Sequence, residues 1–156
     1  MKVLVDTNVI LDVLLKRSAF FTNSRLIFEL AEQKRITGYV TASSITDIFY
    51  IFNKEIKNDE TVYQAIENIT AIFSVVPVTE TTIAGALALR WRDFEDAVQY
   101  MAAKESGIIH VITRNDADYK SPNILCLSPA DFVVYFNSVC PSNPVNISTS
   151  REKNTK

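Results

Sequence analysis

The amino-acid sequence predicts an α/β protein built as a three-layer α/β/α sandwich with a mostly parallel central sheet. Short apolar, β-branched runs recur along the chain, and segments with helical spacing of apolar residues separate them. Strands that alternate with helices in this way are typical of doubly wound parallel sheets. The chain has 156 residues, of which 47% are hydrophobic, so it can bury one good core and we expect one folded domain.

The individual elements follow in chain order. Apolar runs predict strands at residues 3–5, 37–42, 75–78, 108–113 and 124–127. Amphipathic spacing, with Ser, Thr or Asp near several starts, predicts helices at residues 9–15, 24–34, 43–56, 60–72, 82–90, 94–105 and 129–136. Pro77 cannot donate a backbone hydrogen bond, which indicates that its strand lies at an edge of the sheet. Gly107 is expected to end the helix that precedes it.

Composition restricts the classes of function. The formal net charge of −2 gives no overall attraction for nucleic acid, so an RNA partner would need local basic clusters or a bound cation. Charges interrupt every long apolar stretch, and Asp6 and Asp12 lie in the N-terminal one, which argues against a membrane span or a signal peptide and indicates a cytoplasmic protein. The two cysteines have no metal-ligand spacing. We expect residues 1–138 to form the folded domain and the polar residues 139–156 to form a disordered tail.

The segment most informative about function is residues 2–11. A short apolar run ends there in Asp6, Thr7 and Asn8, which places a carboxylate, a hydroxyl and an amide together after the first strand. In open parallel sheets, ligands bind in the crevice outside the carboxyl ends of the strands, where Asp6 is expected. Taken alone, Asp6 is also explained as a cap of the following helix.

Further acids follow later strands or open later helices. Asp47 stands three residues after Ser44, which resembles a capping box. Asp96 lies in an acidic helix start that Asp93 is expected to cap, and such acids are stabilised by the helix dipole. Asp118 follows the strand expected at 108–113, where turn formation alone could explain it.

Each of these acids has its own structural explanation, whereas one site at one edge of the sheet accounts for several of them together. Two carboxylates about 4 Å apart repel by roughly 4 kcal/mol at an effective dielectric constant of 20. A hard divalent cation such as Mg2+ or Mn2+, which prefers oxygen ligands, is the natural counter-charge. Such an ion can generate hydroxide and hold a phosphate during in-line attack.

Four segments, in this order, resemble the PIN-domain family, especially the VapC-type toxin ribonucleases of bacterial toxin–antitoxin pairs. They are Val-Asp-Thr-Asn at 5–8, Ser-Ser-Ile-Thr-Asp-Ile at 43–48, Asp-Phe-Glu-Asp-Ala at 93–97 and Thr-Arg-Asn-Asp-Ala-Asp-Tyr at 113–119. The resemblance runs from Val3 to about Phe136. It implies a PIN-like fold and an acidic pocket that binds one or two Mg2+ or Mn2+ ions and hydrolyses RNA phosphodiester bonds with metal-activated water. It also implies an RNA substrate, a cognate antitoxin protein of a type II pair, and a homodimer.

Carried over to this chain, the resemblance makes Asp6 and Asp96 the principal metal ligands. Asp47 occupies the position of the family's second acid, where Glu is usual, and its shorter side chain reduces its reach. Thr7 or Asn8 would hold a ligand or a water molecule in place.

The late acidic position of the family falls in the turn that follows the fourth strand. We expect Asp118 to be the ligand there, with Asn115 assisting it, and Tyr119 stands where Phe often follows the last acid. Arg114 is the best candidate for an RNA contact, because it lies within this presumptive catalytic turn. The other basic residues are scattered, and such residues usually decorate a solvated face. His110 is expected to be a core histidine, since no Ser or Cys motif accompanies it.

The sequence is also compatible with two other functions. A catalytically weak PIN-like module that binds RNA or protein without turnover is suggested by Asp47 and by the negative net charge. A phosphate-handling receiver or phosphatase fits less well, because the segment from Asp6 to Asn8 lacks the second Asp of a phosphatase motif and no acids are paired at the first strand.

Overall fold

The computed structural model describes residues 1–115, Tyr119 and residues 123–145, and it contains one central sheet. Its five strands are β1 (Lys2–Val5), β2 (Thr37–Thr41), β3 (Ser74–Val76), β4 (His110–Ile112) and β5 (Leu125–Leu127). They lie in the order β3-β2-β1-β4-β5, and every neighbouring pair is parallel. The predicted α/β architecture is therefore confirmed, with β1 at the centre.

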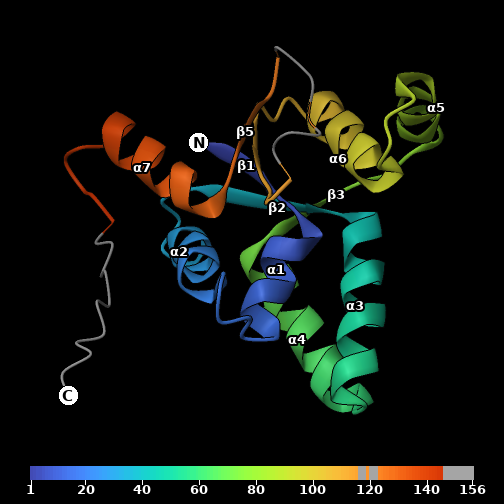
Figure 1. Ribbon diagram of the computed structural model, residues 1–156, viewed down its shortest axis with the longest axis horizontal. Coiled ribbons are helices and arrows are strands. Elements are labelled where there is room, and N and C mark those ends of the chain that lie inside the picture. Colours follow the sequence, from blue (N-terminus) through green and yellow to red (C-terminus); the bar gives the residue numbers. More distant parts are fainter. Residues whose placement is uncertain (116–118, 120–122, 146–156) are drawn as a thin grey trace.

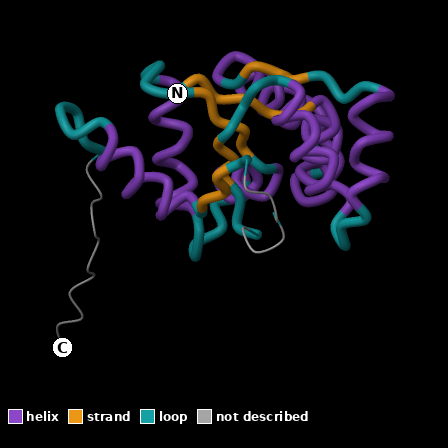
Figure 2. Tube along the Cα trace, turned by 90° about the horizontal axis from the view of Figure 1, so that it is seen from above, coloured by secondary structure: helices purple, strands orange, loops and turns teal. Residues whose placement is uncertain are grey.

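The described residues form seven helices, which cover the two faces of this sheet (Figure 1). They are α1 (Thr7–Leu14), α2 (Phe21–Glu32), α3 (Ala42–Ile56), α4 (Asp59–Ile72), α5 (Glu80–Leu89), α6 (Phe94–Glu105) and α7 (Pro129–Val139). Helices α1, α2, α3, α4 and α7 share one apolar core, whereas α5 and α6 pack on the opposite side. Figure 2 shows the strands between these groups of helices, which is the three-layer arrangement expected from the sequence.

The strands alternate their side chains between the two cores, as a period of two requires. On β1, Val3 and Val5 enter the larger core with α1 to α4, while Leu4 enters the smaller core under α6. All three are fully buried, because a central strand of a parallel sheet is covered on both faces. Gly38 on β2 has a packing reason to lack a side chain, since a Cβ there would lie 2.5 Å from Cδ1 of Phe73.

Most predicted elements are present, and the differences concern their ends. The strand expected at 108–113 is paired only over His110–Ile112, and the last helix extends to Val139. Pro77 directly follows β3, which is an edge strand as predicted. Gly107 has a φ of 65° just beyond the end of α6, as expected for a residue that terminates a helix.

The predicted capping box between Ser44 and Asp47 is wrong. Helix α3 begins earlier, at Ala42, and its N-cap is Thr41, whose side chain accepts a hydrogen bond from the Ser44 backbone N–H at 3.0 Å. The last residue of β2 thus caps α3 directly, and Asp47 lies in the second turn rather than the first.

Residues that follow α7 contact the domain as far as Val145. The backbone N–H of Val145 donates to Oδ1 of Asn137 on α7 at 2.7 Å, and Val145 packs against the larger core. The Arg35 guanidinium also donates to the carbonyl of Asn143. Residues 141–145 were expected to belong to the disordered tail, but they lie against α2 and α7. Residues 146–156 lie outside the described part of the chain. None of the described helices is both long and apolar enough to span a membrane.

Candidate functional site

The strand order itself marks a position for a site. The chain runs from β1 outward to β2 and β3, and then crosses to β4 on the other side of β1. The carboxyl ends of β1 and β4 therefore lie next to each other where the winding direction reverses, and ligands of open α/β sheets bind at such a point. Asp6 directly follows β1, and Thr113 directly follows β4.

Asp6 stands at the N-cap position of helix α1, and its side chain is held at this point mainly by distant residues. Its backbone occupies the N-cap position, but its carboxylate makes no capping hydrogen bond. Instead, Gln99 Nε2 donates to Asp6 Oδ1 at 2.9 Å, and Thr113 Oγ1 donates to Oδ2 at 3.0 Å. The side chain is only 2% exposed. Capping of α1 therefore does not by itself explain the contacts of this carboxylate, which α6 and the end of β4 orient.

A second carboxylate shares one of these donors. Gln99 Nε2 also donates to Oε1 of Glu95 at 3.2 Å, one turn earlier on α6. The same Glu95 oxygen accepts a hydrogen bond from Thr7 Oγ1 at 2.7 Å. Gln99 and Thr7 therefore link Asp6 and Glu95 across the junction between α1 and α6.

Asp96 is the third acid, and it is 4% exposed. Asp93 caps α6 by accepting from the backbone N–H groups of Glu95 and Asp96, as predicted, so Asp96 is free to face the interior. Tyr119 donates its hydroxyl to Asp96 Oδ1 at 3.3 Å. Asp96 Oδ2 is buried and has no hydrogen-bond partner among the described residues.

The electrostatics of these acids reflect burial and mutual repulsion. Burial raises the pKa of Asp6, against the hydrogen bonds from Gln99 and Thr113. Burial, with the charges of Asp6 and Asp93, raises the pKa of Asp96 to about 7. The pKa of Glu95 is raised by burial and by the charges of Asp6 and Asp47, although the Thr7 hydrogen bond opposes this. The site therefore lacks positive charge relative to its carboxylates.

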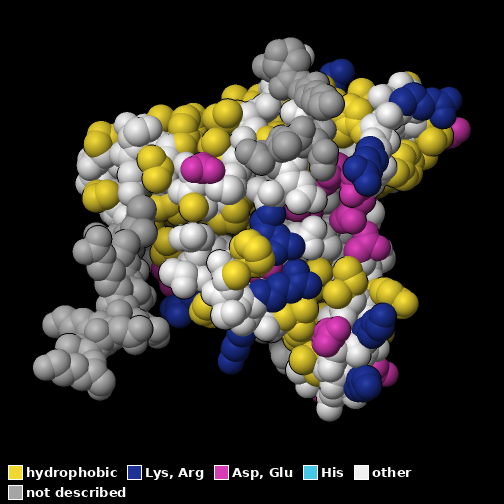
Figure 3. Space-filling model, in the orientation of Figure 1, with side chains coloured by type: hydrophobic (Ala, Val, Ile, Leu, Met, Phe, Trp, Pro, Cys, Tyr) yellow, Lys and Arg dark blue, Asp and Glu magenta, His cyan; other side chains and the backbone are white. Residues whose placement is uncertain are grey.

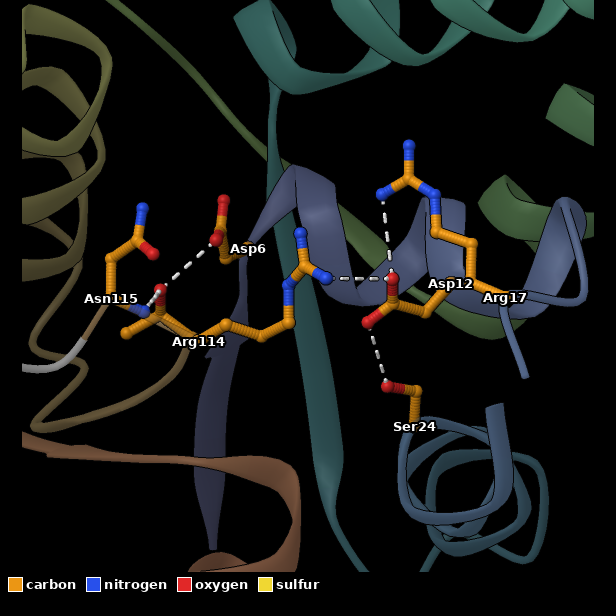
Figure 4. A network of polar contacts seen from close by, with 7 residues as sticks. Asp6, Asp12, Arg17, Ser24, Arg114 and Asn115 are labelled. Atoms are coloured by element: carbon orange, nitrogen blue, oxygen red, sulfur yellow. Dashed lines mark hydrogen bonds and ion pairs between the residues drawn. The ribbon is translucent and has the colours of Figure 1, made fainter. Parts of the chain in front are cut away.

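The opposite end of the site contains a buried ion cluster around Asp12 of α1 (Figure 4). Asp12 is fully buried and lies 3.3 Å from Arg114 Nη1 and 3.4 Å from Arg17 Nη1. Ser24 of α2 also donates to Asp12 Oδ2 at 3.2 Å. The Arg114 side chain extends from beside Asp6 to Asp12 in this view, and its guanidinium lies over the Phe20 ring, 4.2 Å from the centroid.

The other predicted site residues are placed less closely. Asp47 is half-buried on α3, and its charge acts on Glu95. Asn8 is half-buried in the first turn of α1, and its backbone N–H favours the charged form of Asp6. Asn115 is exposed and takes part through its backbone N–H, which donates to Thr113 Oγ1 at 3.0 Å. Asp118 lies outside the described residues.

On the surface, a strip of Asp and Glu side chains runs between α6 and α3, and Lys and Arg side chains gather beside it in the centre of the same face (Figure 3). An acidic strip and a group of basic side chains therefore lie next to each other on this face of the protein.

Comparison with known proteins identifies the family. The family model described as the PIN domain matches residues 2–117, which is most of the chain. The chain belongs to the PIN-domain family. A curated relative, Ribonuclease VapC1 of Aquifex aeolicus (strain VF5), is 26% identical to this PIN domain over 143 residues, which cover 88% of this chain and 97% of the relative.

Solved structures share the fold of this PIN domain. DNA-bound VapBC from Salmonella typhimurium matches with a TM-score of 0.64 at 15% identity, covering 83% of this chain and 98% of that one. VapC20 of Mycobacterium tuberculosis, described as a sarcin–ricin loop cleaving toxin, matches with a TM-score of 0.62 at 15% identity, covering 78% and 96%.

The acids of this PIN domain fit a hard divalent cation in their chemistry. The donor set consists of carboxylate and amide oxygens, and two buried oxygens, Asp96 Oδ2 and Gln99 Oε1, have no described protein partner. Burial raises the pKa of Asp6, Glu95 and Asp96, and the charges of neighbouring acids add to this for Glu95 and Asp96. Among the residues that the structure describes, however, no three Asp, Glu, His or Cys side chains are grouped as a metal site.

Three residues of the site were missed in the sequence. Glu95 was treated only as part of an acidic helix start, and Gln99 and Thr113 were given no role. The sequence contains a usable signal for Gln99 and for Thr113. Gln99 follows Glu95 by four residues and Asp96 by three, so the three side chains lie on the same side of a helix. Thr113 ends the strand that neighbours β1, and its position at the same sheet edge as Asp6 could also have been foreseen.

His110 is buried, and its Nδ1 has no hydrogen-bond partner among the described residues. It is 8% exposed, its Nε2 lies 3.3 Å from the Tyr135 hydroxyl of α7, and burial lowers its pKa.

Proposed function

We propose that this PIN domain is an Mg2+- or Mn2+-dependent endoribonuclease that hydrolyses RNA phosphodiester bonds and is the toxin of a type II toxin–antitoxin pair. The observation that carries the proposal is the pairing of two buried carboxylates, Asp6 and Asp96, at the switch point of the sheet, with charge that only a cation or protons can balance. The relative named Ribonuclease VapC1 and the VapBC structures support the toxin assignment.

In this proposal, Asp6 and Asp96 are the principal metal ligands, and Thr113 and Gln99 keep Asp6 in position. A bound ion would supply an activated water and would stabilise charge on the phosphate. Glu95 accepts the hydrogen bond from Thr7 and so holds the start of α1 against α6. Because Tyr119 donates to Oδ1 of Asp96, Oδ2 is the oxygen of Asp96 that is left for the metal. Asn8 supports the ionised form of Asp6.

The remaining acids complete the proposed site. Asp118 supplies the late metal ligand, with Asn115 holding the turn through its backbone bond to Thr113. Asp47 acts at a greater distance than the Glu usual in the family, through its charge on Glu95.

The proposed partners follow from the two sides of the site. RNA approaches along the basic side, where Arg114 is the candidate contact. A cognate antitoxin protein would cover the site, and a homodimer in the cytoplasm is the proposed resting assembly.

The test is cleavage of a mixed RNA panel in Mg2+, in Mn2+ and in EDTA. Wild type is compared with the Asp6→Asn/Asp96→Asn double variant, and Glu60→Gln, an exposed acid on α4, is the matched control. We expect cleavage by wild type and by the control only with metal, and none by the double variant. Cleavage in EDTA, or equal cleavage by the folded double variant, would refute the proposal.

A second candidate is a PIN-like module that binds RNA or protein without turnover. The observation in its favour is that the described residues contain no group of three metal-binding side chains. Metal-independent RNA binding without cleavage products, from folded wild type, would select this function.

A further inference from the structure

A cavity of about 240 Å³ lies beside the acidic site and is used by no step of the proposed hydrolysis. It lies where the N-terminal ends of α2 and α7 meet the turn after β4. Its walls include Phe20, Asn23, Ser24, Arg114, Ser128 and Pro129. This volume is below the roughly 300–1,000 Å³ that drug-sized ligands occupy, and it suits one heterocyclic ring system.

One residue joins the cavity to the acidic site. Thr113 donates to Asp6, and the next residue, Arg114, forms part of the cavity wall. The charge of Arg114 also lowers the pKa of Asp6, so the two groups are electrostatically coupled. Arg114 is therefore shared by the surroundings of Asp6 and by the wall of the cavity.

The buried Asp12 fixes the guanidinium of Arg114 in this wall. Asp12 makes no contact with the three acids of the site in the described structure, and its side chain engages only Arg17, Arg114 and Ser24. A buried ion pair contributes little net stability, so its value lies in holding a defined arrangement. Two guanidinium groups share one carboxylate here, which leaves net positive charge at the cavity. Asp12 is thus a positioning residue for Arg114.

The cavity wall combines flat and donor-bearing groups. The Arg114 guanidinium lies over Phe20, whose ring is 43% exposed, and planar guanidinium and aromatic groups are the surfaces on which unpaired RNA bases stack. Arg114 presents donors only. Asp12 engages Nη1 and Nε is buried, so the donors left for a ligand are those of Nη2 and the second N–H of Nη1. Guanine O6 and N7 are the acceptors that an arginine fork matches best. Phe20 and Pro129 make part of the wall apolar, which favours a base over a phosphate.

We infer that this cavity binds an unpaired guanine base of the RNA, next to the bond that the acidic site cleaves, with Arg114 as the residue that selects it. The inference rests on the ribonuclease function proposed above. It adds a sequence preference that the acids alone cannot provide, because they contact only the backbone.

The test uses the wild-type protein without metal and without turnover. Guanosine 5′-monophosphate, adenosine 5′-monophosphate and ribose 5-phosphate are titrated separately, and binding is followed by NMR at the Arg114 Nε–H and the Asn23 side-chain amide. We expect both signals to shift with the guanine nucleotide and not with ribose 5-phosphate. Equal shifts with ribose 5-phosphate would assign a phosphate site, and stronger binding of the adenine nucleotide, or no shift at these groups, would also overturn the inference.

A second comparison isolates the arginine fork. We expect Arg114→Lys to weaken binding of the guanine nucleotide by roughly 5- to 100-fold, since Lys keeps the charge but loses the planar fork. Arg92→Lys, at an exposed position, is the matched control and should bind as wild type does. If Arg114→Lys does not fold, the affinity of the wild-type protein for 7-deazaguanosine 5′-monophosphate is measured instead, because this nucleotide lacks the N7 acceptor. Equal affinity for guanosine and 7-deazaguanosine nucleotides would refute the contact. Failure of RNA cleavage, by contrast, leaves the nucleotide result intact and refutes only the nuclease.

Discussion

Asp96→Asn removes the carboxylate whose pKa reaches about 7 through burial and through the charges of Asp6 and Asp93. In the unfolded chain this group has its ordinary pKa of 3.8, so between about pH 4 and pH 7 the folded state keeps a proton that the unfolded state releases. Stability is therefore greatest below this window and falls as the pH rises through it. The full shift corresponds to at most about 4 kcal/mol, and because Glu95 and Asp93 are exposed and water screens the repulsion, we expect about 2 kcal/mol.

Thermal unfolding of metal-free protein tests this magnitude. In EDTA at pH 8, Asp96→Asn should unfold about 4–8 °C above wild type, and at pH 4 the two should nearly coincide. Added Mn2+ should stabilise wild type at pH 8 more than it stabilises the variant, because the cation balances the same repulsion. Glu60→Gln should unfold like wild type throughout. If Asp96→Asn is less stable than wild type in EDTA at pH 8, the argument from burial and repulsion of the Asp96 carboxylate is wrong.

Three further predictions concern single side chains. Gly38→Ala should lower the free energy of unfolding by about 1–3 kcal/mol in urea titrations, because its Cβ meets Phe73, and an unchanged midpoint would contradict this. Tyr119→Phe should weaken Mn2+ binding about 10-fold in calorimetry, since Asp96 Oδ1 loses its donor, and equal affinity would show that the hydroxyl positions nothing. Asp12→Asn should destabilise the protein by about 3 kcal/mol, as two guanidinium groups lose their buried counter-charge, and thermal unfolding at wild-type temperature would disprove it.

The architecture could be predicted because its signals are local. Apolar periodicity placed five strands and seven helices within a few residues of their observed ends, and Pro77 correctly indicated an edge strand. The errors were also local. Helix α3 begins one residue after β2 because Thr41 both ends the strand and caps the helix, and Ser44 offered an equally good cap in the sequence.

The site could be predicted only in part, because its contacts are distant in sequence. Asp6 looked like a helix cap when considered alone, and the residues that decide otherwise, Gln99 and Thr113, lie on α6 and after β4. Glu95 was explained by the helix dipole, which is true of its position but does not reveal its bond to Thr7. The sequence shows which residues share one side of a helix, but it does not show which other helix that side contacts.

Gln99 and Thr113 reach Asp6 across 93 and 107 residues of sequence. Synthesis proceeds from the N-terminus, so β1 and Asp6 are made well before Gln99 and Thr113. We expect a ribosome-bound chain that ends before Thr113 to lack the site, which assays on nascent chains stalled at increasing lengths can verify. The protein therefore remains without its complete acidic site for most of its synthesis.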